Sequence, residues 1–507
     1  MRDKLAIKNG SITLLCQFID IILGFIVRKV FITYIGVEML GVNGTFSSVL
    51  NTLSLAELGF ESAVIYSLYR PINNNNKEEI EKIVSILKRI YEAVGIFILI
   101  GGVVLSLFLP NILSGVEIDG KIYVVFYLQL ASNVVTYFLA YKKSFLLAMQ
   151  KDYIRNIFTS IYKIAATICQ IVLIFTFHSF VLYVAVSIIQ NITTNLSVSI
   201  YVDRKYSFKF NKRVDIDIFK KIFKDVKDIF FSKIAGYVYS STDNLIISAC
   251  VSTASVGLLG NYTQIIYQIK TVISNVFTST KPIIGNFLTA ETDKNHSFQI
   301  LKNYTFIRYS AAIALLVPSF VLCDCFISSW LGNKYILPIE ISLLLVSDVF
   351  IHFVHGALVD YIAGLGYFKA DRRISIVGAI LNLTISYGLV QIIGLAGVLV
   401  GTVISQAYFW ISRSLCVFND YFHDRRKLIN YWLFCIYYTL IFYLLCFLCR
   451  ILFQRIPLAD SYIKFVIGGV GCYLIVLPIY FVCFSKTNEF DYLRHMIKNQ
   501  MLRLIKK

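Results

Sequence analysis

The sequence predicts an all-α polytopic membrane protein with about 14 transmembrane helices. Of its 507 residues, 57% are hydrophobic and 15% are charged, whereas soluble domains are nearer to 45–50% apolar and about 25% charged. The mean hydropathy is +0.70. Apolar stretches of about 20 residues, long enough to cross a bilayer as helices, follow one another along the chain. Too few polar side chains remain to cover the surface of a soluble protein.

The positions of these stretches give the expected spans in chain order. They lie at 10–34, 41–69, 84–109, 122–147, 154–177, 180–202, 229–250, 255–288, 304–327, 337–363, 374–393, 396–419, 429–452 and 462–484.

The segments between the spans set the orientation. Lys and Arg gather in alternate segments, such as the run from Arg204 to Lys227, and are absent from others, such as 36–40 and 391–395. Because short cytoplasmic loops carry the excess of Lys and Arg, we expect both termini in the cytoplasm. The net charge of +18 comes from these loops and does not form a continuous basic face for nucleic acid.

Segment 203–228 is the longest expected cytoplasmic connection, and it divides the chain after six spans. Its pattern VDIDIFKKIFKDVKD predicts an amphipathic helix on the membrane surface, and the basic tail 485–507 repeats this pattern. On the two sides of this segment, EMLGVNGTFSSVL (38–50) and SVGLLGNYTQIIY (255–267) resemble each other weakly. Internal duplication is common in transporters, which bind substrate between the repeats.

The stretch Gly41–Arg70 predicts one wall of a polar cavity. At about 100° per residue, one helix through this stretch would place four polar side chains within about 40° of Asn43, on one face. This face comprises Asn43, Ser47, Ser54, Glu57 and Glu61. A carboxylate facing hydrocarbon is costly, so this face is expected to meet protein or water.

Further polar faces on other spans predict a hydrated cavity between two lobes. Its basic side chains suit an anionic ligand, because Arg can hold phosphate bidentately and Lys acts as a point charge. The predicted cavity residues are Arg28, Lys163, Lys233, Lys270, Asn244, Asn261, Gln264 and Gln268. The predicted gating or charge-balancing residues are Asp20, Glu57, Glu61 and Asp243. The alternative is internal pairing, in which Arg28 binds Glu57 or Asp20.

Span 337–363 carries Asp348, His352 and His355 within about 60° of one another on a helix. A histidine beside a carboxylate is a candidate proton site for ion coupling. The alternative is a polar helix interface whose groups satisfy one another. A zinc site would need further ligands, so no metal is expected here.

No enzyme motif is found. The sequence lacks a phosphate-binding Gly loop, Gly-x-Ser-x-Gly and His-Glu-x-x-His. The 11 cysteines lie mostly within apolar stretches, so we interpret them as packing residues. We therefore expect neither a catalytic site nor a cofactor.

Four segments resemble the polysaccharide transport family, the lipid-linked repeat-unit flippases of the superfamily that also holds multidrug exporters and lipid II flippases. They are LSLAELGFESAVIYSLYRPI (53–72), STDNLIISACVSTASVGLLGNYTQII (241–266), YIAGLGYFKADRRISIVGAILNL (361–383) and IIGLAGVLVGTVISQ (392–406).

This resemblance implies two pseudo-symmetric six-helix lobes and two additional C-terminal helices. The expected parts are 1–202 (first lobe), 203–228 (linker), 229–420 (second lobe), 429–484 (additional helices) and 485–507 (tail). It also implies alternating-access transfer of an undecaprenyl-diphosphate-linked oligosaccharide across a bacterial inner membrane, with a polymerase and a chain-length regulator as candidate partners. Arg28 and the lysines of spans seven and eight are the positions that fit the diphosphate.

Two rival functions remain. A cation-coupled small-molecule exporter of the same superfamily should have an acidic or apolar cavity, which the basic residues disfavour. A membrane polysaccharide polymerase should carry a large outward loop with catalytic residues, whereas the expected outward loops are short.

Overall fold

The computed structural model describes residues 2–54, 60–206, 219–220, 242–278, 280–455 and 461–505, and all regular elements in them are helical. Residue contacts divide the chain into two compact units, Met1–Gly257 and Leu258–Lys507, which we call unit 1 and unit 2. The predicted linker 203–228 lies largely outside the described residues, so the predicted domain boundaries stay a prediction.

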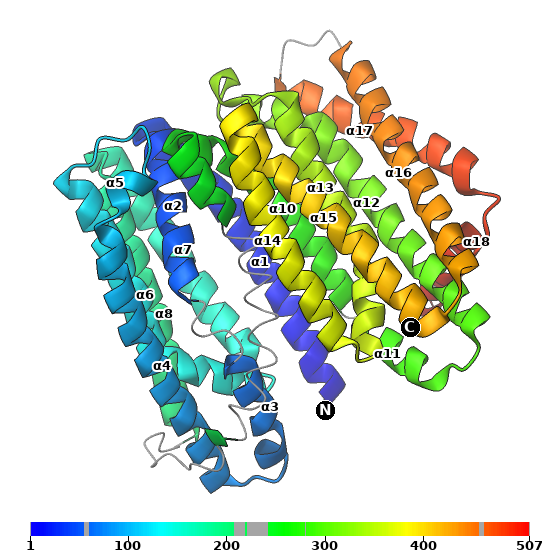
Figure 1. Cartoon of the computed structure of the whole chain (residues 1–507). Helices are drawn as coiled ribbons and strands as arrows, with labels where there is room; N and C mark the ends of the chain where they lie inside the picture. The colour runs from blue at the N-terminus through cyan, green and yellow to red at the C-terminus, as the bar shows by residue number, and fades with distance from the viewer. Residues whose placement is uncertain are drawn as a thin grey trace. The chain divides into compact units, whose positions relative to one another are not determined.

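Unit 1 is built from long helices that pack side by side (Figure 1). Their bounds are α1 (Arg2–Tyr34), α2 (Val37–Leu53), α3 (Phe60–Asn73), α4 (Lys77–Ser106), α5 (Leu109–Ile112), α6 (Gly120–Ala148), α7 (Asp152–Phe177) and α8 (Phe180–Tyr206). Residues 242–250 are also helical, and α10 (Thr253–Thr278) begins in this unit.

Helix starts in unit 1 follow capping chemistry. Asn76 accepts a hydrogen bond from the Glu79 amide (3.2 Å) before α4, and Asp119 accepts one from the Ile122 amide (3.0 Å) before α6. Such side chains satisfy amides that have no partner in the first helical turn. Within the unit, α4 packs on α6, α6 on α8, and α1 on α7. This packing brings α6 and α8 together beside the site described below.

The prediction of a single helix through Gly41–Arg70 is wrong. Helix α2 ends at Leu53 with Ser54 as its C-cap, and α3 begins at Phe60. The Ser54 hydroxyl donates to the Leu50 carbonyl (3.1 Å) in the last turn of α2. Glu57, predicted on the same face as Asn43, lies outside the described residues.

Two glycines permit direct backbone contact between α2 and the start of α10. A Cβ atom on Gly41 would lie 1.8 Å from the Thr253 carbonyl oxygen, and one on Gly257 would lie 2.2 Å from the Val37 carbonyl oxygen. No real side chain fits at such distances, so this crossing requires glycine on both helices. Small residues serve close helix packing in membranes in the same way.

Unit 2 contains the remainder of α10 and the elements that follow it (Figure 1). They are α11 (Lys281–Ala290), α12 (Lys294–Trp330), η2 (Asn333–Tyr335), α13 (Ile339–Gly364), α14 (Phe368–Ile393), α15 (Leu395–Val417), η3 (Phe418–Phe422), α16 (Arg425–Gln454), α17 (Ser461–Phe484) and α18 (Asn488–Ile505). Helix α13 is packed by α11, α12 and α15, and most of its side chains are buried. Helix α18 packs on α12, where Glu489 pairs with Lys302 (2.6 Å).

The stretch 255–288, predicted as one span, is not one continuous helix. Helix α10 ends at Thr278, and α11 begins at Lys281 with Pro282 in its first turn. Proline has no amide hydrogen and its ring clashes with the preceding turn, so it starts a helix more easily than it continues one.

The chain is an all-helical multi-pass membrane protein. Within the described residues, nine helices are long and apolar enough to span a bilayer, namely α6, α7, α8 and α12 to α17. Large apolar side chains stand exposed on them, including Leu474 (70%) and Val482 (79%) of α17. Exposure of such large apolar surfaces to water is unfavourable, whereas lipid tails can cover them.

Candidate functional site: a carboxamide cavity in unit 1

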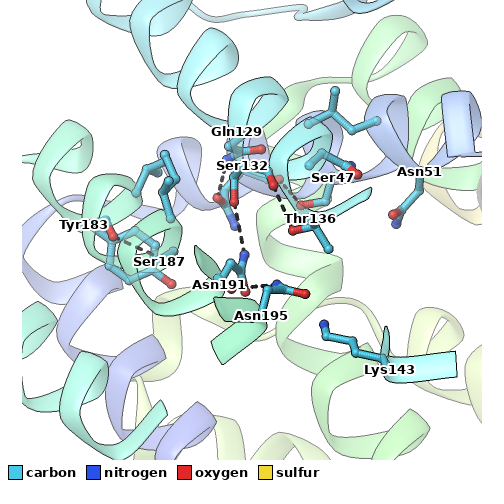
Figure 2. A pocket seen from close by; sticks show the side chains of 15 residues that line it. Ser47, Asn51, Gln129, Ser132, Thr136, Lys143, Tyr183, Ser187, Asn191 and Asn195 are labelled. Atoms are coloured by element: carbon cyan, nitrogen blue, oxygen red, sulfur yellow. Dashed lines mark hydrogen bonds between the residues drawn. The ribbon is translucent and has the colours of Figure 1, made fainter. Parts of the chain in front are cut away.

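A cavity of about 440 Å³ lies between α2, α6 and α8 (Figure 2). Only three of its 15 lining residues, Leu50, Val184 and Ile188, are apolar. The others are Asn43, Ser47, Asn51, Gln129, Ser132, Asn133, Thr136, Lys143, Tyr183, Ser187, Asn191 and Asn195. Of these lining residues, all from the described part of the chain, six are carboxamides and none is acidic. We call this site the carboxamide cavity.

Helical spacing explains why these side chains meet. Residues three, four or seven positions apart share one face of an α-helix. Helix α8 places Ser187, Asn191 and Asn195 at successive intervals of four, and α6 places Gln129, Ser132 and Thr136 at intervals of three and four. Both helices are candidate membrane spans, so these polar faces would be costly against lipid.

Hydrogen bonds between the helices hold the walls in place. The amide group of Gln129 on α6 donates to Oδ1 of Asn43 on α2 (2.8 Å). On the other side, Nδ2 of Asn191 on α8 donates to Oγ of Ser132 on α6 (3.2 Å; Figure 2). The cavity therefore has fixed polar walls instead of a set of independently mobile side chains.

Some polar atoms of the cavity have no partner. Asn195 is only 3% exposed, and its Nδ2 donates to the Asn191 carbonyl (2.6 Å), yet its Oδ1 accepts no hydrogen bond. A buried polar atom without a partner costs about 1–3 kcal/mol. Within the described parts of the chain, the side chains of Asn51, Asn133 and Lys143 also form no hydrogen bond or ion pair. Their donors and acceptors are available to a ligand.

Lys143 is the one charged residue that lines the cavity within the described ranges. It extends from α6 toward the side lined by Asn195 (Figure 2). Glu61 on α3 interacts electrostatically with Lys143, while its Oε1 accepts a hydrogen bond from the Ser144 hydroxyl (2.8 Å). Glu61 was predicted to balance Arg28, and its hydrogen bond instead joins α3 to α6.

Three of the predicted residues of unit 1, Arg28, Lys163 and Asn244, do not line this cavity. Lys163 pairs with Asp20 (3.3 Å), and Arg28 donates to the Gly257 carbonyl (3.5 Å). Asn244 donates to the Ser48 hydroxyl (3.1 Å). The cationic partner of Asp20 is thus a lysine on α7 and not the arginine on its own helix. Lys233 and Glu57 lie outside the described residues, and Asp243 lies in the helical stretch 242–250.

In unit 2, the predicted residues Lys270 and Asp348 form an ion pair (3.7 Å), and Gln406 donates to the same carboxylate (2.8 Å). Asn261 is fully buried, and Gln264 and Gln268 are partly buried on α10. These contacts agree with internal pairing of charges, the alternative to ligand binding.

In the predicted proton site, His355 is likewise bonded to residues of the protein itself. Arg413 has only donors, so its NH1 donates to Nε2 of His355 (2.8 Å). The other ring nitrogen therefore carries the hydrogen and donates to the Ile351 carbonyl (2.7 Å). This arrangement fixes a neutral His355 tautomer. The ring of His352 stands edge-on to it, 5.9 Å between centroids.

A further buried network was not predicted. Arg308 of α12 bonds to Asp360 of α13 (2.5 Å) and to Tyr304 (2.8 Å), and Lys281 lies 3.7 Å from the other carboxylate oxygen. A Cβ atom on Gly356 would lie 2.3 Å from the Arg308 guanidinium, so glycine makes room for it. In this network of unit 2, the single carboxylate of Asp360 pairs with two cations, Arg308 and Lys281.

Sequence reasoning missed most of the carboxamide cavity. Asn191 and Asn195 lie four residues apart in an apolar span, which is a usable signal of a polar helix face, but neither was predicted as a site residue. Lys143 was not among the predicted cavity residues. Asn43 and Ser47 were predicted as cavity lining, and both line it.

Comparisons with known proteins place this geometry in context. A sequence model of the polysaccharide biosynthesis protein family matches residues 6–287. No curated protein sequence matches the chain.

Solved structures share the fold. The lipid II flippase MurJ in an inward closed conformation superposes with a TM-score of 0.65 at 14% identity, covering 95% of this chain and 100% of that one. An inward-facing multidrug resistance MATE family transporter of the MOP superfamily gives 0.60 at 15% identity, covering 81% and 98%. A point mutant of the Vibrio cholerae MATE transporter VcmN gives 0.54 at 16% identity, covering 82% and 97%. At these identities the likeness concerns the fold alone.

Proposed function

Because the chain belongs to the polysaccharide biosynthesis protein family, we propose that it is a flippase for undecaprenyl-diphosphate-linked oligosaccharide repeat units. It moves them by alternating access across the inner membrane of a bacterium, for the synthesis of O-antigen, capsule or exopolysaccharide. This proposal includes about 14 spans with both termini in the cytoplasm, of which the described residues supply nine candidates.

The carboxamide cavity is the observation that carries the proposal. A transporter of a polar headgroup must replace the water around that group while it crosses the hydrocarbon layer. Six carboxamides and several hydroxyls on membrane-length helices supply such replacement hydrogen bonds. The volume of about 440 Å³ falls within the range of small-molecule sites, about 300–1,000 Å³.

The basic residues have the chemistry to hold the diphosphate. Arg28, Lys163, Lys233 and Lys270 remain the candidates, with Asp20, Glu57, Glu61 and Asp243 as balancing groups. The ion pairs Lys163–Asp20 and Lys270–Asp348 would release a cation toward an anionic ligand only when the pair separates. No covalent step is needed. Energy would come from an ion gradient, the membrane potential or removal of the product by a polymerase.

The rival cation-coupled exporter is less well supported. A site for organic cations should present carboxylates, and the described residues contribute none to the carboxamide cavity. The candidate coupling residues Asp348 and His355 are bonded to Lys270 and Arg413. If Asp348 and His355 couple transport to an ion, their bonds to Lys270 and Arg413 must open. A drug-efflux assay with His352→Ala and His355→Ala variants tests this coupling.

Deletion of the gene in its host tests the proposed function. We expect undecaprenyl-linked repeat units to accumulate in the inner leaflet and to disappear from the outer surface, measured by lipid extraction and by lectin labelling of spheroplasts. A plasmid copy should restore display, Arg28→Ala and Lys233→Ala should restore it poorly, and the control Lys82→Ala should restore it fully. Lys82 is partly exposed and pairs with Glu78 one turn away. Normal display in the deletion strain would refute the proposal.

A further inference from the structure

We infer that the carboxamide cavity is a subsite for uncharged, hydroxyl-bearing sugar rings, in which Oδ1 of Asn195 accepts a hydrogen bond from the saccharide. This inference rests on the proposed function and assigns one part of the cargo to one part of unit 1. The basic residues Arg28 and Lys163, which do not line the cavity, are left for the diphosphate.

The unpaired atom decides the chemical class of the ligand. Oδ1 of Asn195 is an acceptor, buried and without a hydrogen bond, so its partner must donate a hydrogen. An ionised diphosphate or carboxylate offers only acceptors and cannot serve. Sugar hydroxyl and acetamido groups both donate.

An organic cation is a poor alternative. It could donate a hydrogen bond to Asn195, but Lys143, the one charged side chain among the described lining residues, would repel it. Among the lining residues that the structure describes, none is an acid that could compensate a bound cation. A neutral ligand that both donates and accepts satisfies the carboxamides without a charge penalty.

The remaining lining fits the same ligand. The carboxamide of Asn133 and the ammonium group of Lys143, both without a hydrogen bond in the described residues, offer donors for ring and hydroxyl oxygens. Leu50, Val184 and Ile188 give apolar patches for the C–H faces that a sugar ring also presents. Since the hydrogen bonds between α2, α6 and α8 already fix the walls, little side-chain ordering is needed on binding.

Purified full-length protein provides the test. The probes are the oligosaccharide released by mild acid from the surface polysaccharide of the host, and inorganic diphosphate, each titrated by calorimetry. Asn195→Leu should weaken oligosaccharide binding about tenfold, the effect of losing one hydrogen bond to a buried partner. Diphosphate binding should stay unchanged.

Two further variants make the result decisive. Asn133→Leu removes a side chain without a hydrogen bond in the described residues, so it should weaken oligosaccharide binding with little risk to folding. Thr194→Val is the matched control: Thr194 adjoins Asn195, is 5% exposed and has an equally unpaired Oγ1, but it does not line the cavity. It should bind the oligosaccharide as the unmodified protein does.

Three results would overturn the inference. They are no oligosaccharide binding, unchanged binding in Asn195→Leu and Asn133→Leu (as expected if water alone fills the cavity), or weakened binding of diphosphate in the same variants. The gene deletion separates these failures from a failure of the proposed function. If repeat units accumulate inside the deletion strain while the cavity variants bind normally, only the sugar subsite is wrong.

Discussion

The buried pair Arg308–Asp360 leads to a strong prediction about stability. Asp360 is 2% exposed and Arg308 is 5% exposed, and their charged groups meet at 2.5 Å. Asp360→Asn keeps the shape of the side chain but removes its charge, which leaves the guanidinium and the nearby Lys281 uncompensated. Breaking a buried pair on one side costs about 3–5 kcal/mol. For a unit of this size, that cost lowers the unfolding midpoint by about 10 °C.

Replacement of both partners distinguishes the effect of an uncompensated buried charge from a general packing defect. Arg308→Met with Asp360→Leu removes both charges, and replacing a buried pair by apolar residues is often neutral. We therefore expect the double variant to unfold closer to the unmodified protein than Asp360→Asn does. Thermal unfolding in detergent, followed by intrinsic fluorescence, measures both.

An exposed pair provides the control for this prediction. Glu78→Gln breaks the surface pair with Lys82, in which the Glu78 side chain is 69% exposed, and should change stability by less than about 1 kcal/mol. If Asp360→Asn unfolds at the same temperature as Glu78→Gln, or if the double variant is less stable than Asp360→Asn, the reasoning fails.

Two further predictions concern unit 1. Gly41→Ala should force α2 away from the Thr253 carbonyl by about 1.5 Å and lower the free energy of unfolding by about 1–3 kcal/mol. The control is Gly388→Ala, because the added Cβ would meet nothing within 4 Å. Equal thermal stability of the two variants would contradict the close crossing of α2 and α10. Lys163→Met and Asp20→Asn should each lower the free energy of unfolding by about 1 kcal/mol or less, because about a third of each side chain is exposed. A coupling energy well above about 1 kcal/mol in a double-mutant cycle would contradict this expectation.

Composition was enough to predict a helical membrane protein, because surfaces that face lipid raise the apolar fraction of the whole chain. The helix breaks were partly readable. Pro282 stands where α11 begins, and a proline restricts the local backbone in any context. The end of α2 at Leu53 carries no such signal, so one helix was predicted where the structure has two.

The site was less predictable than the fold because its partners come from different helices. Periodicity placed Asn43 and Ser47 on one face, but nothing in that face reveals that Gln129 will bond to Asn43. Likewise, Asp20 was open to several cations in the sequence, and packing of α1 on α7 selected Lys163. Charge pairing is a property of tertiary contacts, and a single sequence does not contain them explicitly.

The pairing of Asp324 with Arg450 (2.5 Å) has a consequence for how the chain is made. The two residues are 126 positions apart, and synthesis at about 5–20 residues per second delays the arginine by about 6–25 seconds. During that interval α12 has been synthesised, but the carboxylate of Asp324 has no arginine partner yet. Arg308 waits for Asp360 over 52 positions, a much shorter time. The order of translation therefore leaves the Asp324 carboxylate without its arginine partner for longer than the Arg308 guanidinium of the same helix waits for Asp360.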